Sequence, residues 1–181
     1  MTRVSPGRPA PSEHIPYYGQ YIRLVPDGDI VEILERQLEA TLATAASVTP
    51  ELARARSAPE AWNAIELAGH LADAERILTY RAFRFARADP APLAGVDFES
   101  YVPAAGFSQR TFADVIEEFA SVRQATLTLL RSLDAAAWTR DGLADGQRIS
   151  VRALAYVLAG HELAHTGDIR DALQRPSESA V

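Results

Sequence analysis

Apolar side chains recur every three or four residues along four long segments of the chain, which is the spacing of one face of an α-helix. The four helices predicted from these stripes are residues 29–47, residues 63–88, a third that follows Ser108 or Thr111 and reaches Leu133, and a last one from Ser150 to at least Ile169. No stretch alternates apolar and polar residues well enough to indicate a strand. Four long amphipathic helices without a sheet predict an all-α protein, a four-helix bundle.

The ends of these helices carry the residues that usually begin or stop a helix. Asp27 or Asp29 can cap the first helix, and Ser150 can cap the last. Pro90 and Pro92 end the second helix, because proline cannot continue a helix and disfavours helical geometry in the residue before it. The local signals therefore agree with the apolar pattern.

Residues 1–26 are expected to form an extended arm rather than a helix, because they are rich in proline and turn-forming residues. The tyrosines of the arm, Tyr17, Tyr18 and Tyr21, suggest that part of it packs on the domain or on a partner. The bundle itself is expected over residues 27–175, with a short tail at 176–181.

Two connections between the predicted helices differ in kind. Residues 89–110, which include Asp97, Phe98 and Tyr101, form a long linker of low periodicity. A structureless stretch of that length is uncommon in a compact domain and is more often functional than idle. The region from Trp138 to Gly146 holds two Asp-Gly pairs and reads as turns.

Composition narrows the class of protein. The chain has 181 residues, 48% of them hydrophobic and 23% charged, which suits one globular domain. No apolar stretch reaches the roughly 18 residues of a membrane span, and the N-terminus lacks the apolar core of a secretory signal. The net charge of −6 and the lack of a basic run argue against nucleic-acid binding. Because there is no cysteine, disulfides and thiolate ligands are excluded, and a cytoplasmic location without membrane contact is expected.

The clearest chemical signal is a pair of histidines on the last helix. His161 and His165 are four residues apart, so they differ by about 40° around the helix and about 6 Å along it. Both continue the apolar stripe of Leu154 and Leu158, so they should face the bundle interior. Two buried imidazoles need partners for four ring nitrogens. A shared metal ion would supply the partner for one nitrogen of each ring.

His70 occupies a comparable inward edge of the second helix. A lone inward histidine is more often a hydrogen-bonded core residue than a ligand, but three imidazoles from facing helices suit Zn²⁺, Ni²⁺ or Fe²⁺ and leave one coordination position open. Glu75 or Asp97 could close that position. His14 lies in the arm and is expected to be exposed.

Two other motifs overlap the histidine pair. The run from His161 to His165 matches the H-E-x-x-H pattern of zinc proteases, in which the glutamate is the general base. No strand to bind peptide is predicted, and few residues follow that could add a ligand. The Glu162-x-x-His165 pattern of di-iron bundles occurs only once, which disfavours a carboxylate-bridged pair of irons.

Carboxylates near the histidines could orient the metal ligands, because metal-bound imidazoles usually donate their other N–H to a carboxylate or carbonyl. The acidic candidates for this role are Asp73, Glu75, Glu162 and Asp168. For any one of them, a solvated charge or a helix ion pair is the simpler interpretation. Arg81, Tyr101 and Tyr156 are candidates for orienting a substrate.

Two segments carry a family resemblance. The segment from Trp62 to Arg76, followed by Tyr80-Arg81-Ala82, resembles the second helix of the DinB-like (YfiT-like) superfamily. The segment from Ser150 to His165 resembles its fourth helix, and Tyr21 to Pro26 and the Asp97 linker also fit. The resemblance covers roughly residues 17–174 and implies an up-down-down-up bundle, commonly dimeric. It also implies a divalent metal on three histidines, which match His70, His161 and His165.

For function, the resemblance implies a metal-dependent enzyme acting on a small electrophilic molecule. Some relatives resemble transferases that use a low-molecular-weight thiol such as bacillithiol or mycothiol, and others resemble metal-dependent hydrolases. Because this chain has no cysteine, the thiol would arrive as a cosubstrate. The alternative is a non-catalytic metal-binding or stress-associated dimer whose metal site is structural.

Overall fold

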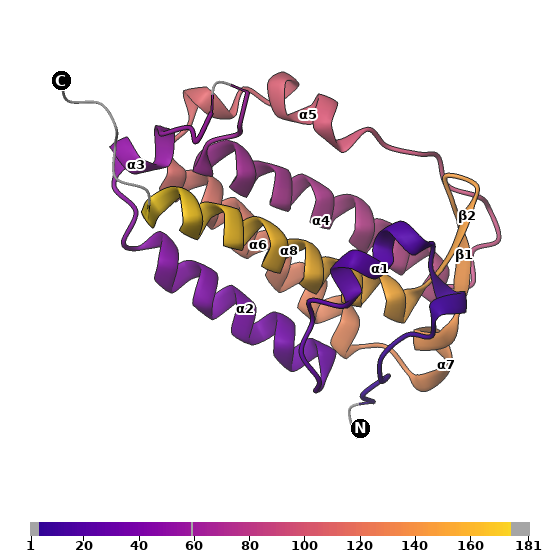
Figure 1. Cartoon of the computed structure of the whole chain (residues 1–181). Coiled ribbons are helices and arrows are strands. Elements are labelled where there is room, and N and C mark those ends of the chain that lie inside the picture. Colours follow the sequence, from indigo (N-terminus) through magenta and orange to yellow (C-terminus); the bar gives the residue numbers. More distant parts are fainter. Residues whose placement is uncertain (1–3, 59, 175–181) are drawn as a thin grey trace.

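The computed structural model of the protein describes residues 4–58 and 60–174, with side chains as far as residue 167. Its bundle consists of the four predicted long helices (Figure 1): α2 (Ile30–Ala45), α4 (Ala64–Ala86), α6 (Phe112–Arg131) and α8 (Val151–Gln174). Asp29 caps α2 by accepting hydrogen bonds from two backbone N–H groups, Thr111 caps α6, and the Ser150 hydroxyl accepts from the N–H of Ala153. The predicted four-helix bundle is confirmed.

The order of helix directions follows from the connections. α2 and α8 run in one direction along the bundle, whereas α4 and α6 run in the other (Figure 1). The parallel neighbours α4 and α6 are joined by residues 87–111, which cross the whole length of the bundle. This is the up-down-down-up order implied by the resemblance, and it places α4 beside α8.

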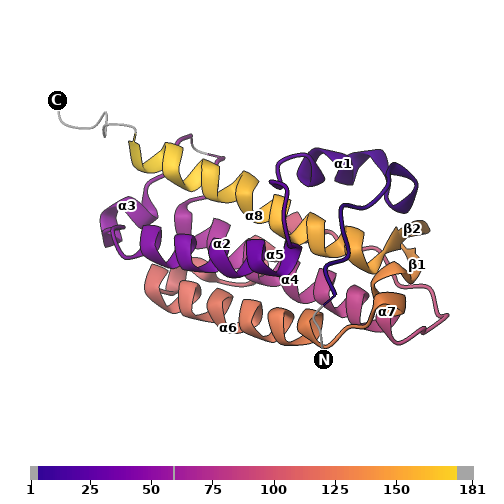
Figure 2. The ribbon, with the colours of Figure 1, turned by 90° about the horizontal axis from the view of Figure 1, so that it is seen from below.

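The N-terminal arm contains helical structure that the sequence did not predict. A 3-10 turn at Pro11–Glu13 precedes α1 (Pro16–Ile22), and α1 lies across the outside of α8 (Figure 2). The expectation of an arm without a helix was therefore wrong. A helix this short is marginal by itself, and α1 is stabilised by burying Gly19 and Ile22. The Arg8 guanidinium also donates to the carbonyls of Ile22 and Val25, at 2.7 Å each.

The connections are more regular than predicted. They contain α3 (Pro50–Arg54), α5 (Phe98–Ala104), a 3-10 turn η2 (Phe107–Gln109) and α7 (Ala135–Thr139). β1 (Asp141–Ala144) and β2 (Gln147–Ser150) form an antiparallel hairpin, so the expectation of no strand was wrong. Asp145 and Gly146, with φ of 54° and 68°, make the left-handed two-residue turn that matches strand twist.

The apolar stripes of the four helices meet in the bundle interior. Phe85, Leu127 and Trp138 are each about 1% exposed, and Leu34 and Leu154 are fully buried. Within the described residues, no helix is long and apolar enough to cross a bilayer. The packing of α4 against α8 brings His70 opposite the histidine pair of the last helix.

Candidate metal centre

The three predicted metal ligands, called the histidine cluster below, meet between α4 and α8. His70 comes from α4, and His161 and His165 come from successive turns of α8. One ligand nitrogen from each lies within 4.8 Å of the others, and His70 Nε2 is 3.1 Å from His161 Nε2. Two imidazole nitrogens that bind one ion at about 2.0–2.1 Å each are about 2.9–3.4 Å apart in tetrahedral or octahedral geometry. The observed separation fits a shared ion.

The rings of the cluster point their edges at one another rather than stacking. The three centroid separations are 5.0 Å for His70 with His161, 5.0 Å for His70 with His165 and 4.6 Å for His161 with His165. The ring planes are inclined by 62°, 84° and 82° in the same order. In-plane nitrogen lone pairs can converge in such an arrangement, whereas stacked rings would direct them apart.

The electrostatics of the cluster favour neutral imidazoles. Burial, together with repulsion from His165, lowers the pKa of His70 from 6.5 to about 4. Burial and the two neighbouring imidazoles lower the pKa of His161 well below 6.5. Only a neutral imidazole has a lone pair for a metal ion. At neutral pH these two side chains are therefore ready to act as ligands.

Nδ1 of His70 is buried and lacks a hydrogen-bond partner among the described residues. Asp73, which was predicted to accept from His70, instead accepts a hydrogen bond from Arg76 at 3.1 Å. Buried polar atoms are almost always paired with protein, water or an ion. The His70 ring is thus set up for a partner that the polypeptide does not supply.

Glu75 is a neighbour of the cluster in sequence but has another role. Its two carboxylate oxygens accept hydrogen bonds from Nε and Nη2 of Arg123, both at 2.7 Å. Both side chains are almost completely buried, with exposed fractions of 2% and 1%. This bidentate pair between α4 and α6 occupies the glutamate, so Glu75 is not a metal ligand.

Glu162 is bound to the same arginine. Its Oε2 accepts from Arg123 Nη1 and its Oε1 accepts from the Thr41 hydroxyl, both at 2.7 Å. Thr41, Glu75, Arg123 and Glu162 are called the Arg123 network below. Because Glu162 faces this network rather than open solvent, it is not placed as the general base of a zinc protease. The H-E-x-x-H interpretation is wrong for this chain.

The remaining predicted orienting residues lie elsewhere or beyond the described side chains. Arg81 donates to the carbonyl of Ala94 and is eleven residues from His70, about 16 Å along α4. Tyr156 is buried beneath the Arg8 guanidinium, 5.4 Å from its ring centroid. Tyr101 is exposed on α5. The side chain of Asp168 lies outside the described residues.

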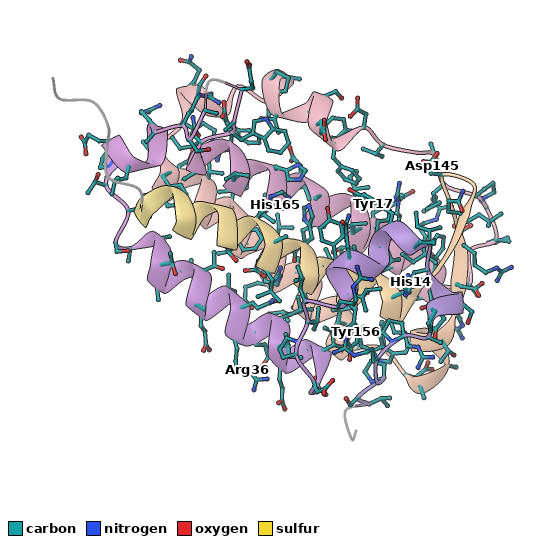
Figure 3. All side chains as sticks on the ribbon, in the orientation of Figure 1. His14, Tyr17, Arg36, Asp145, Tyr156 and His165 are labelled. Carbon is teal, nitrogen blue, oxygen red and sulfur yellow. The ribbon has the colours of Figure 1, made fainter. Side chains whose placement is uncertain are left out.

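Three aromatic residues that the sequence did not assign to the site contact the cluster. Tyr21 of α1 packs edge-on against His161 with centroids 5.3 Å apart. Trp62, just before α4, lies 4.9 Å from the His70 ring, and Phe98 of α5 lies 6.4 Å from it. Tyr21, Trp62 and Phe98 are called the aromatic wall below. In Figure 3, His165 lies on the side of α8 that faces α4, and Tyr17 stands on α1 near the same region.

Glycine precedes a histidine on both helices, in the repeated letters Leu-Ala-Gly-His at 67–70 and 158–161. A Cβ on Gly160 would lie 2.0 Å from the carbonyl oxygen of Tyr21, so the backbone of α1 rests directly on α8. A Cβ on Gly69 would lie 2.3 Å from the Phe107 ring. The repeat is a sequence signal that segments outside the bundle approach closely beside His70 and His161.

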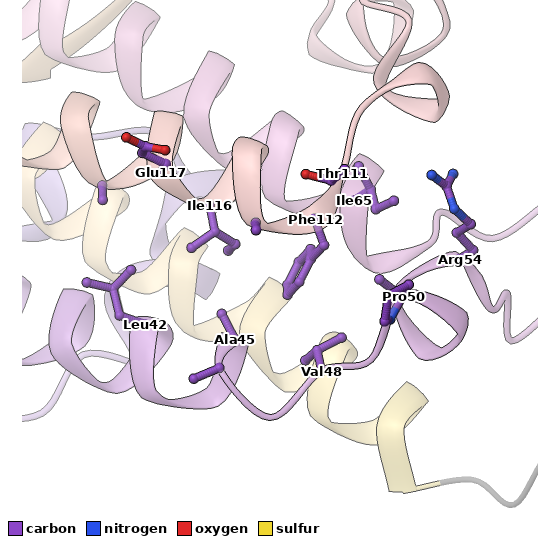
Figure 4. Close-up of a pocket in the computed structure, with 14 residues that line it drawn as sticks. Leu42, Ala45, Val48, Pro50, Arg54, Ile65, Thr111, Phe112, Ile116 and Glu117 are labelled. Atoms are coloured by element: carbon purple, nitrogen blue, oxygen red, sulfur yellow. The ribbon is translucent and has the colours of Figure 1, made fainter.

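Large cavities elsewhere do not include the cluster. A cavity of about 530 Å³ opens between α2, α3 and α6, with Phe112 and Ile116 among its apolar walls (Figure 4). A second, of about 560 Å³, is a shallow groove along α4 and α6 beside Tyr80 and Phe83. Neither is lined by a histidine or by a residue of the aromatic wall. The chemistry of the side chains, rather than cavity size, identifies the candidate site.

Comparison with known proteins agrees with this geometry. Residues 33–169 match the model of the DinB superfamily, and no protein with a curated description matches the chain. A similar solved structure is YfiT from Bacillus subtilis, which is described as a probable metal-dependent hydrolase with an unusual four-helix bundle topology. The two structures superpose with a TM-score of 0.67 over 92% of this chain and 91% of YfiT, at 13% sequence identity. The family model spans both helices that carry the histidines, and the chain belongs to the DinB superfamily.

Proposed function

We propose that the protein is a metal-dependent enzyme, most simply a hydrolase, with one divalent ion held by His70, His161 and His165. Two findings support this proposal: the separation of the ligand nitrogens and the lowered histidine pKa values. The likeness to YfiT supports a hydrolase in particular. Zinc, nickel and iron all suit three imidazoles.

The hydrogen bonds of the nearby carboxylates are the observation that favours an enzymatic metal site over a structural one. A structural zinc site is closed by four protein ligands, whereas a catalytic site keeps one position for water or substrate. Glu75 and Glu162 are both held by Arg123, and Asp97 accepts from the N–H of Ser100 as the cap of α5. Within the described side chains, the acidic residues that could have closed the site are thus engaged, which favours a site with three protein ligands and an open position.

The residues around such an ion would have distinct tasks. When bound, a divalent ion supplies Lewis acidity, which lowers the pKa of a coordinated water to about 7 and polarises a carbonyl or phosphoryl oxygen. The two histidines of α8 and His70 of α4 would hold the ion, so the packing of α4 against α8 would determine how its ligands are placed. Tyr21, Trp62 and Phe98 exclude bulk water from one side of the cluster.

Metal analysis tests the first half of the proposal. Protein purified without a histidine tag is expected to hold about one divalent ion per chain. Zn²⁺ or Ni²⁺ added after chelation should raise the melting temperature of the wild type and of His14→Ala, but not of His161→Ala. His14 is a suitable control because its Nδ1 bonds to the carbonyl of Ile15, outside the cluster. The proposal would be overturned if the purified wild type held no metal and its melting temperature changed neither with chelator nor with added ions.

Activity measurements test the second half. Metal-loaded wild type is compared with His161→Ala on activated esters and amides, and on an electrophilic acceptor with bacillithiol, mycothiol or glutathione. Hydrolysis that depends on His161 supports the hydrolase. Turnover only with a thiol would replace the hydrolase by a thiol S-transferase at the same site. Equal rates for the mutant and wild type in all assays would assign the metal a structural role.

A further inference from the structure

The aromatic wall gives the candidate site a chemical preference, because its three rings gather around two of the ligands. Tyr21 contacts His161, and Trp62 and Phe98 contact His70 from two other segments of the chain. All three side chains are only partly buried, so each ring keeps some surface available to a molecule at the metal. None of the three comes from the long bundle helices, which carry the ligands themselves.

The positions of these rings are fixed by backbone packing. The close approach of Tyr21 O to Gly160 holds α1 on α8 one residue before His161. The Arg8 and Glu13 side chains tie the arm down at either end, through the carbonyl of Val25 and through Arg152. On the other side, Phe107 rests on Gly69 and holds the crossover that carries Phe98 against α4. The wall is therefore pre-formed.

We propose that the site takes small molecules that carry a neutral aromatic or extended apolar group next to the atoms that bind the metal. This inference rests on the proposed metal site and concerns the rest of the molecule bound there. Aromatic faces carry partial negative charge, which disfavours an anionic group lying against them. They attract cations, but the divalent ion beside them repels a second positive charge. A neutral apolar group satisfies both conditions.

The rim of the wall is polar on one side. The hydroxyls of Tyr17 and Tyr21 lie 3.3 Å apart, and Tyr17 is 59% exposed. The apolar group is thus expected against the rings of Trp62 and Phe98, with hydrogen-bonding groups toward α1.

A pair of hydroxamates tests the proposal. Acetohydroxamate and benzohydroxamate bind metals through the same two oxygens and differ in a methyl against a phenyl group. Benzohydroxamate should bind the zinc-loaded protein about tenfold tighter, the gain expected when roughly 60 Å² of ring surface leaves water. The ratio is corrected by measuring both ligands with free Zn²⁺.

Substitutions then test whether the aromatic wall causes the preference for benzohydroxamate. Trp62→Ala should bring the affinity ratio close to one, and Phe98→Ala provides a second variant if the first folds poorly. Phe83→Ala is the matched control, since Phe83 is an exposed aromatic residue of α4 outside the wall, and it should keep the wild-type ratio. A wild-type ratio near one would overturn this inference and leave the metal site standing. Failure of both hydroxamates to bind zinc-loaded protein would contradict the open site, and the inference with it.

Discussion

Two buried polar groups, the Arg123 network and the histidine cluster, lie side by side in this bundle. They differ in whether every polar atom has a hydrogen-bond partner. The Arg123 network has a partner for each charged oxygen, because four hydrogen bonds to the two carboxylates are all 2.7 Å long. The histidine cluster has two Nε2 atoms facing each other and a buried Nδ1 without a partner among the described residues. The polypeptide alone satisfies the first group, whereas in the second the two facing Nε2 atoms suit a shared cation and Nδ1 of His70 needs a separate hydrogen-bond acceptor.

The difference separates a structural role from a binding role. Burial disfavours the charged guanidinium, but the two carboxylates outweigh this effect and raise the pKa of Arg123 above its ordinary value. The histidines have no such compensation, so burial moves the pKa values of His70 and His161 downward and leaves them neutral. One guanidinium between two carboxylates also leaves a formal negative charge next to the cluster, which favours a cation there.

The largest expected effect comes from removing the centre of the network. Arg123→Met leaves Glu75 and Glu162 buried without their cation, so the free energy of unfolding should fall by about 3–5 kcal/mol. Urea unfolding measures this loss of free energy. The control is Arg131→Met, which breaks an exposed pair with Glu35 and should cost less than about 1 kcal/mol. Equal losses in the two variants would show that the network does not stabilise the fold.

The next largest effect is expected when the pH is lowered, which should destabilise the folded protein through the histidine cluster. In chelated, metal-free protein the pKa of His70 falls from 6.5 to about 4 on folding. The folded state then binds fewer protons than the unfolded state, so this contribution is fully present above pH 6.5 and is lost as the pH falls toward 4. The loss should approach about 3 kcal/mol.

Urea unfolding across this pH range gives the slope, and two variants assign it. His70→Leu should reduce the slope, because a leucine binds no proton in either state and the contribution of His161 remains. His14→Leu should leave it unchanged. A slope in His70→Leu as steep as in the wild type would mean that His70 does not contribute to the acid sensitivity.

The smallest effect concerns one hydroxyl at the edge of the network. Thr41→Val removes the hydrogen bond to Glu162 Oε1 with little change in volume, and should lower the free energy of unfolding by about 1.5–2 kcal/mol. Thr44→Val is matched on the same helix, where the hydroxyl bonds only to the carbonyl of Ala40 near the surface. It should change stability by less than about 0.5 kcal/mol. If thermal unfolding shows the same shift for both, Glu162 is satisfied without Thr41.

Part of the fold could be predicted because its signals are local. The stripe of α2 and the cap Asp29 lie within one segment, and the structure places both as expected. The hairpin also had a local signal, since Asp145-Gly146 is the left-handed pair of a two-residue turn. Its strands were missed because each has only four residues, too few to show a clear alternation. The helix α1 was missed because its stability comes from contact with α8.

The candidate site also has one part that the sequence predicted and another that it did not. The spacing of His161 and His165 is a property of one helix, and it indicated a shared ion before any tertiary contact was known. The partners of the nearby carboxylates could not be found by spacing. Arg123 is 48 residues from Glu75 and 39 from Glu162, and nothing in the sequence pairs them.

By itself, the sequence determined the four long helices, their caps and the inward histidine pair, because helical period and spacing act over a few residues. The family resemblance added His70 and the direction of each helix. Only the tertiary structure decided which partners hold the nearby carboxylates Glu75 and Glu162 and which rings border the histidine cluster. Those choices depend on contacts between α1, α4, α5, α6 and α8, whose residues are far apart in the chain and meet only when the apolar faces pack.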